Sequence, residues 1–282
     1  MYRAKANRSG AKVFDSLTDE GMRHRAELET ELKVAMDDGS LVPYFQPFVD
    51  LVTGKIVGHE VLARWNHPLR GSVPPAEFVK IAEDAGMVEK LFWLMLRAAC
   101  KKHVDGGFDT ILSLNLVPAQ IENPAFVKQL IEELEAIGFP PHLLEVEITE
   151  TTSMGDLDRA RPMLMLLKTC GIQIALDDFG VGYSSLALLR SLPISKLKID
   201  RSFTSDLETD DPGRATLVNA ILGIASAMYL KVTAEGIEHP EVAEYLRTHG
   251  AHYGQGYLYG RPSTEIVLEV NAPPAVPARR RA

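Results

Sequence analysis

The sequence of 282 residues predicts an α/β fold in the form of a closed barrel. From Val42 onward, short runs rich in β-forming residues alternate with helical stretches, which is typical of a parallel sheet with crossover helices. Eight such runs can be counted, and helices outside an eight-stranded barrel are the expected arrangement. The expected strands span residues 42–51, 55–65, 111–117, 143–149, 172–176, 196–199, 231–234 and 256–259. The expected helices span residues 20–36, 75–85, 89–102, 124–137, 156–169, 214–228 and 240–249.

The first two strands depart from the regular pattern. Only Val52, Thr53 and Gly54 join them, which is far too short a link for a crossover between parallel strands. These two strands should therefore form an antiparallel hairpin. The predicted fold is a TIM-like (β/α)8 barrel whose first strand runs antiparallel to the rest.

Both ends of the chain are expected to lie outside the barrel. Residues 1–18 are polar and basic, and Thr18 with Asp19 can cap the first helix. The apolar face of that helix would consist of Leu28, Leu32, Val34 and Ala35. From Asn271 the chain is rich in proline, which is typical of a disordered tail. We expect an N-terminal segment over residues 1–38, a barrel domain over residues 39–265 and a C-terminal tail over residues 266–282.

Composition and charge narrow the class of protein. The net charge of −8 argues against a partner such as DNA or RNA, because nucleic-acid-binding proteins present a basic face. Cys100 and Cys170 have no CxxC spacing and indicate buried thiols in a reducing compartment. No apolar run has the length of a transmembrane helix, so we expect a cytoplasmic domain, although a longer parent protein could be membrane-tethered.

Polar side chains gather at the predicted carboxyl ends of the strands, where barrel enzymes carry their chemistry. They are Glu60, Asn115, Glu147, Glu150, Asp177, Asp178, Lys198, Asp200, Glu235 and Gln255. Each alone has an ordinary structural interpretation, as a turn cap, a loop residue, a solvated strand residue or a surface ion pair. Together they indicate a site, because several unpaired carboxylates at one end of a barrel would repel each other unless cations lay between them.

This set of donors predicts hard divalent cations, since Mg²⁺ and Mn²⁺ prefer oxygen ligands. Adjacent strand residues face opposite ways, so Asp177 and Asp178 reach one site only if the strand ends between them. Two metal ions roughly 3.5–4 Å apart would activate a water for hydrolysis of a phosphate ester. Lys198 would orient that water or stabilise the developing charge, and Arg64 would hold a phosphate oxygen.

Several short motifs surround these residues in a fixed order. They are Tyr44-Phe45-Gln46-Pro47, Glu60-Val61-Leu62-Ala63-Arg64-Trp65, Asn115 with Gln120, Glu147-Ile148-Thr149-Glu150, Asp177-Asp178-Phe179-Gly180 followed by Gly182-Tyr183-Ser184-Ser185-Leu186, Lys198-Ile199-Asp200, Ala234-Glu235-Gly236 and Gly254-Gln255-Gly256-Tyr257-Leu258. Over roughly residues 39–265 this order resembles the EAL-domain cyclic di-GMP phosphodiesterases. The resemblance implies a barrel that hydrolyses cyclic di-GMP to linear pGpG with two Mg²⁺ or Mn²⁺ ions in each active site.

The resemblance also implies roles for single residues. The ligands of the first metal would be Glu60, Asn115, Glu147 and Asp177, and those of the second Asp177, Asp178 and Glu235. Lys198 would contact the catalytic water, and Glu150 would orient the ligands. Substrate would contact Gln46, Leu62, Arg64, Asp200 and Gln255. Glu238 would hold the loop after Asp178 in place.

Two positions depart from the family pattern. Val61 stands where the signature triplet has alanine, at a position that is not a ligand, so we expect little effect. Val181 stands where the family usually has threonine. It belongs to the loop over residues 179–186, which in the family helps to build a dimer interface. The loss of the threonine hydroxyl should affect the loop and its regulation.

Residues 1–7 resemble the last helix of a GGDEF diguanylate cyclase-like domain, with an ordinary basic helix end as the alternative. An upstream GGDEF or sensory domain and a homodimer are thus the expected partners. Two other functions stay open: a receptor or regulatory module that binds cyclic di-GMP with weak or no turnover, and a scaffold that binds neither nucleotide nor metal. The complete set of expected ligands favours hydrolysis.

Overall fold

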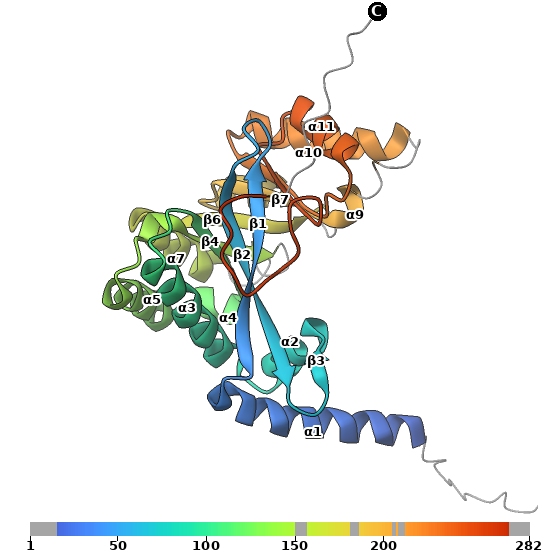
Figure 1. The fold of residues 1–282 in the computed structure, drawn as a ribbon. Helices are drawn as coiled ribbons and strands as arrows, with labels where there is room; N and C mark the ends of the chain where they lie inside the picture. The colour runs from blue at the N-terminus through green and yellow to red at the C-terminus, as the bar shows by residue number, and fades with distance from the viewer. Residues whose placement is uncertain (1–15, 150–156, 181–185, 205–206, 208–211, 271–282) are drawn as a thin grey trace, which may run out of the picture. The chain divides into compact units, whose positions relative to one another are not determined.

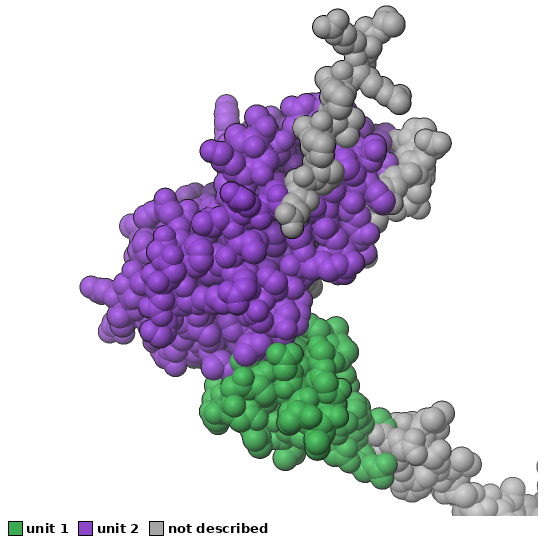
Figure 2. All heavy atoms as spheres, viewed as in Figure 1, with its two compact units in different colours: residues 1–41, 65–91 green, residues 42–64, 92–282 purple. Residues whose placement is uncertain are grey.

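The computed structural model describes residues 16–149, 157–180, 186–204, 207 and 212–270. The chain divides into two compact units, shown in different colours in Figure 2. Residues 1–41, as far as they are described, form one unit with residues 65–91. Residues 42–64 form the other with the described part of residues 92–282.

The larger unit contains the predicted barrel (Figure 1). Its strands are β1 (Leu41–Asp50), β2 (Ile56–His67), β4 (Ile111–Leu116), β5 (Leu144–Thr149), β6 (Gln173–Phe179), β7 (Lys196–Ile199), β8 (Lys231–Ala234) and β9 (Tyr253–Gln255). They follow one another in the order β1-β9-β8-β7-β6-β5-β4-β2, and a β1–β2 pairing closes the ring. Pairing is parallel from β2 through β9, whereas β1 is antiparallel to β9. The predicted fold class, including its antiparallel first strand, is confirmed.

The β1–β2 hairpin follows from its short link. The Asp50 carboxylate accepts hydrogen bonds from the backbone N–H groups of Val52 and Thr53, at 3.0 and 2.7 Å. Gly54 has a φ of 69°, a backbone conformation that suits glycine because it has no Cβ. The Asp50 N–H then donates to the Lys55 carbonyl at 2.9 Å, so the second strand begins beside the end of the first.

Helices connect the parallel strands. They are α3 (Val88–Asp105), α4 (Pro118–Ile121), α5 (Pro124–Ile137), α7 (Leu157–Thr169), α8 (Leu186–Ser191), α9 (Arg201–Thr204), α10 (Pro212–Ala227) and α11 (Pro240–Thr248), with a 3₁₀ turn at Pro141–Leu143. The predicted bounds of α5 are confirmed because both ends carry strong signals. The Asn123 side chain accepts from the Ala125 N–H, Pro124 is the first helical residue, and Gly138 ends the helix with a φ of 76°. Within the described ranges, no helix has an apolar stretch that would cross a bilayer.

The smaller unit is built from α1 (Ser16–Asp38), α2 (Pro75–Asp84), the end of β2 and the short strand β3 (Gly71–Val73). Leu28, Leu32 and Ala35 of α1 are buried as predicted, but Val34 is 61% exposed, so its place on the apolar face was wrong. Helical geometry places a residue two positions after Leu32 on another face. The predicted cap at Thr18 was also wrong, because α1 already includes that residue.

The last strand lies earlier than predicted, at Tyr253–Gln255 instead of residues 256–259. Gly256 has a φ of 155°, and a Cβ built on it would lie 2.1 Å from the Ile237 carbonyl oxygen. The Tyr259 and Gly260 N–H groups both donate to the Gly256 carbonyl. The chain therefore turns at Gly256 after a close backbone approach, which ends the strand.

Candidate active site

Strand alternation carries charged side chains into the interior of the barrel. On β5, Glu145 and Glu147 lie on the same face, and on β7 so do Lys196 and Lys198. The four side chains meet as two ion pairs across β6, which runs between the two strands. The residues between them, such as Val146 and Leu197, are fully buried on the opposite, apolar face. On these two strands the side chains that face the barrel interior are therefore charged, and those that face the surrounding helices are apolar.

Lys198 stands at the centre of the predicted site. Its ammonium nitrogen lies within 4 Å of four carboxylates: Glu235 at 2.6 Å, Glu147 at 2.7 Å, Asp177 at 3.4 Å and Glu60 at 3.8 Å. The lysine side chain is only 3% exposed. One buried ammonium cannot neutralise four ionised carboxylates, so the cluster would carry a strong excess of negative charge if all four were ionised.

Amide side chains hold Glu60 at the edge of this cluster. Asn115 Nδ2 donates to Glu60 Oε1 at 3.2 Å, and Gln255 Nε2 donates to Glu60 Oε2 at 2.6 Å. Gln255 Nε2 also lies 3.4 Å from Gln46 Oε1. The structure thus brings four of the predicted residues from β1, β2, β4 and β9 into one hydrogen-bonded group. The alternative interpretation of Gln255 as a loop residue is wrong, since it ends β9 and is buried.

Asp177 and Asp178 reach the site by a different route from the predicted one. The strand does not end between them: β6 continues to Phe179, and its register against β7 shifts between Leu176 and Phe179. Asp178 has a φ of 55°, an uncommon conformation for a residue other than glycine. Its N–H donates to the Asp177 Oδ1 at 3.0 Å. A bulge with a left-handed residue, rather than a strand end, changes the direction of the second carboxylate.

The pKa values reflect the crowding of negative charge. Burial raises the pKa of Glu147 well above its ordinary value, although the Lys198 ammonium opposes the shift. Burial likewise raises the pKa of Glu235 to about 8. The pKa of Asp178 is raised by burial and by the charge of Asp177. Burial alone would lower the pKa of Lys198, but the surrounding carboxylates, Glu147 and Glu235 first, raise it well above the ordinary value. The cluster would therefore gain from an added positive charge.

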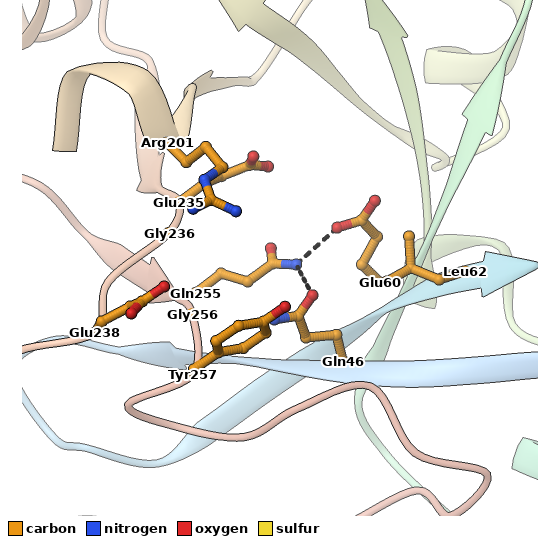
Figure 3. A pocket seen from close by; sticks show the side chains of 10 residues that line it. All are labelled: Gln46, Glu60, Leu62, Arg201, Glu235, Gly236, Glu238, Gln255, Gly256 and Tyr257. Carbon is orange, nitrogen blue, oxygen red and sulfur yellow. Dashed lines mark hydrogen bonds between the residues drawn. The ribbon is translucent and has the colours of Figure 1, made fainter. Parts of the chain in front are cut away.

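An open pocket with about 520 Å³ of empty space adjoins the cluster. Figure 3 shows the side chains that line the pocket, among them Gln255 donating to both Glu60 and Gln46, with Leu62 beside Glu60. The residues that line the pocket are Gln46, Glu60, Leu62, Arg201, Glu235, Gly236, Glu238, Gln255, Gly256 and Tyr257. Six of the predicted site residues thus border one open pocket.

The other predicted residues lie in different surroundings. The Arg64 guanidinium is 5.8 Å from the centre of the Tyr44 ring and donates to the Ala63 carbonyl at 2.9 Å. Asp200 accepts from the Ser202 N–H at 2.9 Å, as an N-cap does, and its charge helps to raise the pKa of Asp178. Glu150 and Val181 lie outside the described residues, as does most of the loop that Glu238 is predicted to hold.

Four residues of this region were missed in the sequence. Arg201 lines the pocket beside Glu235 (Figure 3). Ser113, Glu145 and Lys196 lie inside the barrel, two residues before the predicted Asn115, Glu147 and Lys198. The period of two was a usable signal, because a residue two positions before an inward-facing residue of a strand also faces inward.

The chemistry of the donors fits divalent cations. Carboxylate and amide oxygens are the ligands that Mg²⁺ and Mn²⁺ prefer, and Glu235 Oε1 is buried without a hydrogen bond of good geometry despite its 2.6 Å approach to Lys198. Among the residues that the structure describes, no three His, Cys, Asp or Glu side chains enclose a metal position as they stand. The carboxylates instead gather around the buried Lys198 ammonium.

The chain is similar in sequence and structure to known proteins. The EAL domain family model matches residues 29–262. An uncharacterized signaling protein of Caulobacter vibrioides is 38% identical over 264 residues, which are 93% of this chain and 32% of that protein. The bifunctional diguanylate cyclase/cyclic di-GMP phosphodiesterase MucR of Pseudomonas aeruginosa is 36% identical over 267 residues, 93% of this chain and 39% of MucR.

A solved structure of the PaMucR phosphodiesterase in complex with c-di-GMP superimposes with a TM-score of 0.79 at 36% identity, over 84% of this chain and 97% of that one. This chain spans about a third of the length of the curated relatives that it matches. The family match covers the barrel and every described residue of the carboxylate cluster. The chain therefore belongs to the EAL domain family.

Proposed function

We propose that this chain hydrolyses cyclic di-GMP to linear pGpG with bound Mg²⁺ or Mn²⁺. The observation that carries the proposal is the excess of buried carboxylates around Lys198, next to an open pocket. Family membership supports it, together with the c-di-GMP complex of the related phosphodiesterase. EAL proteins that hydrolyse this nucleotide are generally dependent on divalent metal.

The metal ligands in this proposal come from five strands, β2, β4, β5, β6 and the end of β8. Glu60, Asn115, Glu147 and Asp177 would hold the first ion, and Asp177, Asp178 and Glu235 the second. Bound cations would supply Lewis-acid chemistry, activation of a water and stabilisation of charge on the phosphoryl oxygens. The raised pKa values of Glu147 and Glu235 support cation binding, because an added positive charge favours their ionised forms.

Lys198 and the pocket residues would position the water and the nucleotide. The Lys198 ammonium is fixed between Glu147 and Glu235, so it can orient a water and stabilise negative charge that develops on the phosphate. Arg64 would bind a phosphate oxygen, since stacking near Tyr44 leaves part of its fork of N–H donors for a ligand. Gln46, Leu62 and Gln255 would contact the nucleotide from the pocket wall. Asp200 would also contact the nucleotide. Glu150 would orient the metal ligands, and Glu238 would hold the loop after Asp178 in place.

The proposal extends to the setting of the chain. Residues 39–265 would be the phosphodiesterase domain, with residues 1–38 as a link to an upstream GGDEF or sensory domain and residues 266–282 as a tail. The much greater length of the relatives supports further domains in the whole protein. A homodimer with a cytoplasmic site would complete the arrangement, in which the loop at residues 179–186 and its Val181 connect assembly to the metal site.

The test is a turnover assay with purified protein. We expect cyclic di-GMP to be converted to pGpG with Mn²⁺ or Mg²⁺ and to be stable in EDTA, with chromatography of the products as the readout. Asp177→Asn should abolish turnover because it removes a ligand of both ions, while the fold remains. Tight nucleotide binding without turnover in the presence of either metal would instead assign the chain to the receptors.

A further inference from the structure

A second buried ion pair lies inside the barrel beneath the carboxylate cluster. Lys196 Nζ is 2.6 Å from Glu145 Oε2, and both side chains are at most 3% exposed. The Lys196 ammonium also lies 4.8 Å from the ring centres of Phe48 and Tyr253. These aromatic faces add to the stabilisation of the buried charge. The proposed reaction uses none of these four residues.

Ser113 connects this lower pair with the site. The side chain is fully buried, and its hydroxyl lies 2.6 Å from Glu147 Oε1 and 3.0 Å from Glu145 Oε1. A serine hydroxyl has one proton, so at any moment it can donate to only one of the two carboxylates. The shorter contact is the one to Glu147.

Lys196 pairs with only one of the two carboxylates that the Ser113 hydroxyl can reach. Glu145 has the Lys196 ammonium as its own counter-ion, whereas Glu147 shares the Lys198 ammonium with three other carboxylates. Glu147 is therefore the less compensated of the two and gains more from the hydroxyl. On the other side, Glu147 Oε2 accepts from Lys198 at 2.7 Å, so the two oxygens of Glu147 are held from opposite directions. A carboxylate with both oxygens bound has one orientation, and ordered ligand groups of this kind tune metal affinity.

We propose that Ser113 is a positioning residue that orients Glu147 for the divalent cation, and that the Lys196–Glu145 pair keeps the Ser113 proton directed to Glu147. This inference rests on the proposed function only in taking Glu147 as a metal ligand. It does not depend on the nucleotide or on turnover.

The first test measures the affinity of the full chain for Mn²⁺ by calorimetry without nucleotide. Ser113→Cys replaces the hydroxyl by a slightly larger thiol that is only a weak donor, and it should weaken Mn²⁺ binding about 10- to 100-fold. The matched control is Ser195→Ala, whose hydroxyl donates to the Ile174 carbonyl at 3.2 Å away from the carboxylates. The control should bind Mn²⁺ as the unmodified protein does, and equal affinities for the two variants would overturn the proposal.

The second test concerns the lower pair. Lys196→Met leaves Glu145 without its counter-ion, so Glu145 should draw the Ser113 proton and Mn²⁺ binding should weaken. The double variant Glu145→Gln/Lys196→Met removes the competing charge, so the affinity should return to within about threefold of the unmodified protein. If Lys196→Met does not fold, the comparison of Ser113→Cys with Ser195→Ala decides alone. A double variant as weak as a folded Lys196→Met would contradict the part assigned to the pair.

The outcomes separate this inference from the proposed function. A chain that binds Mn²⁺ but leaves cyclic di-GMP intact would refute the hydrolase and leave the comparison of serine variants valid. A chain that hydrolyses cyclic di-GMP and shows no effect of Ser113→Cys on Mn²⁺ affinity would refute the positioning role alone. A chain with no affinity for Mn²⁺ would refute both.

Discussion

Replacing Glu235 by glutamine should stabilise the metal-free protein, and the gain should grow with pH. The Glu235 side chain is 20% exposed and lies against the buried Lys198, and partial burial raises its pKa from 4.5 to about 8. In the folded protein the side chain therefore keeps its proton up to about pH 8, whereas in the unfolded chain it loses the proton near pH 4.5. Glutamine imitates the protonated carboxyl at every pH, so the variant avoids this loss of stability.

The size of the effect follows from these two values. Below pH 4.5 both states are protonated, and the two proteins should have nearly equal free energies of unfolding. Between pH 4.5 and pH 8, each pH unit lowers the stability of the unmodified protein by about 1.4 kcal/mol relative to the variant. The expected gain is thus about 2 kcal/mol at pH 6 and about 4 kcal/mol at pH 8.

The assay is equilibrium unfolding by urea in EDTA at pH 4.5, 6 and 8. Glu269→Gln is the control, since this exposed glutamate does not line the pocket, and it should change the free energy of unfolding by less than about 0.5 kcal/mol. A Glu235→Gln variant that is no more stable than the unmodified protein at pH 8 would refute the reasoning. So would a gain of equal size at pH 4.5 and pH 8.

Three further predictions concern single side chains. Lys198→Met should abolish turnover of cyclic di-GMP. It should also lower the free energy of unfolding in EDTA by about 3–5 kcal/mol, because it leaves buried carboxylates without their counter-ion. A normal rate of pGpG formation would contradict this prediction. Tyr229→Gly should raise the free energy of unfolding in urea by about 1 kcal/mol, since Tyr229 is 96% exposed with a φ of 58° after α10, while Tyr229→Ala should bring no gain. Burial lowers the pKa of His59 to about 4, so the neutral histidine contributes fully to the free energy of unfolding above pH 6.5, and about 3 kcal/mol of that free energy should be lost as the pH falls to 4. His59→Gln should lack this loss in urea titrations. Identical pH profiles for the two proteins would refute the prediction.

The alternation of strands and helices was enough to predict the barrel, because most of the β-rich runs after the first hairpin are separated by helical stretches. Asn123, Pro124 and Gly138 fix both ends of α5, for example. The errors fall where tertiary contacts decide the conformation. Gly256 turns the chain beside Ile237 and moves the last strand forward, which no local pattern around Gln255 indicates.

The site residues at the carboxyl ends of the strands could be predicted from the sequence, and those deeper inside the barrel could not. Carboxyl ends of strands draw attention to Glu147 and Lys198. Glu145 and Lys196 lie two residues earlier on the same strands, and Ser113 lies two residues before Asn115 on β4. Buried charges within a strand look improbable until their partners are known, and those partners are separated by about fifty residues in the sequence. The bulge at Asp178 was likewise not predictable, since it arises from the register between β6 and β7.

The central claim is that this carboxylate cluster holds divalent metal at a phosphodiester. Its most direct test is the anomalous scattering of Mn²⁺ in crystals of the chain grown with Mn²⁺ and cyclic di-GMP. We predict two anomalous peaks, both beside Asp177, with the nucleotide phosphate in contact with them. A bound nucleotide with no anomalous peak among Glu60, Glu147, Asp177 and Glu235 would contradict the claim.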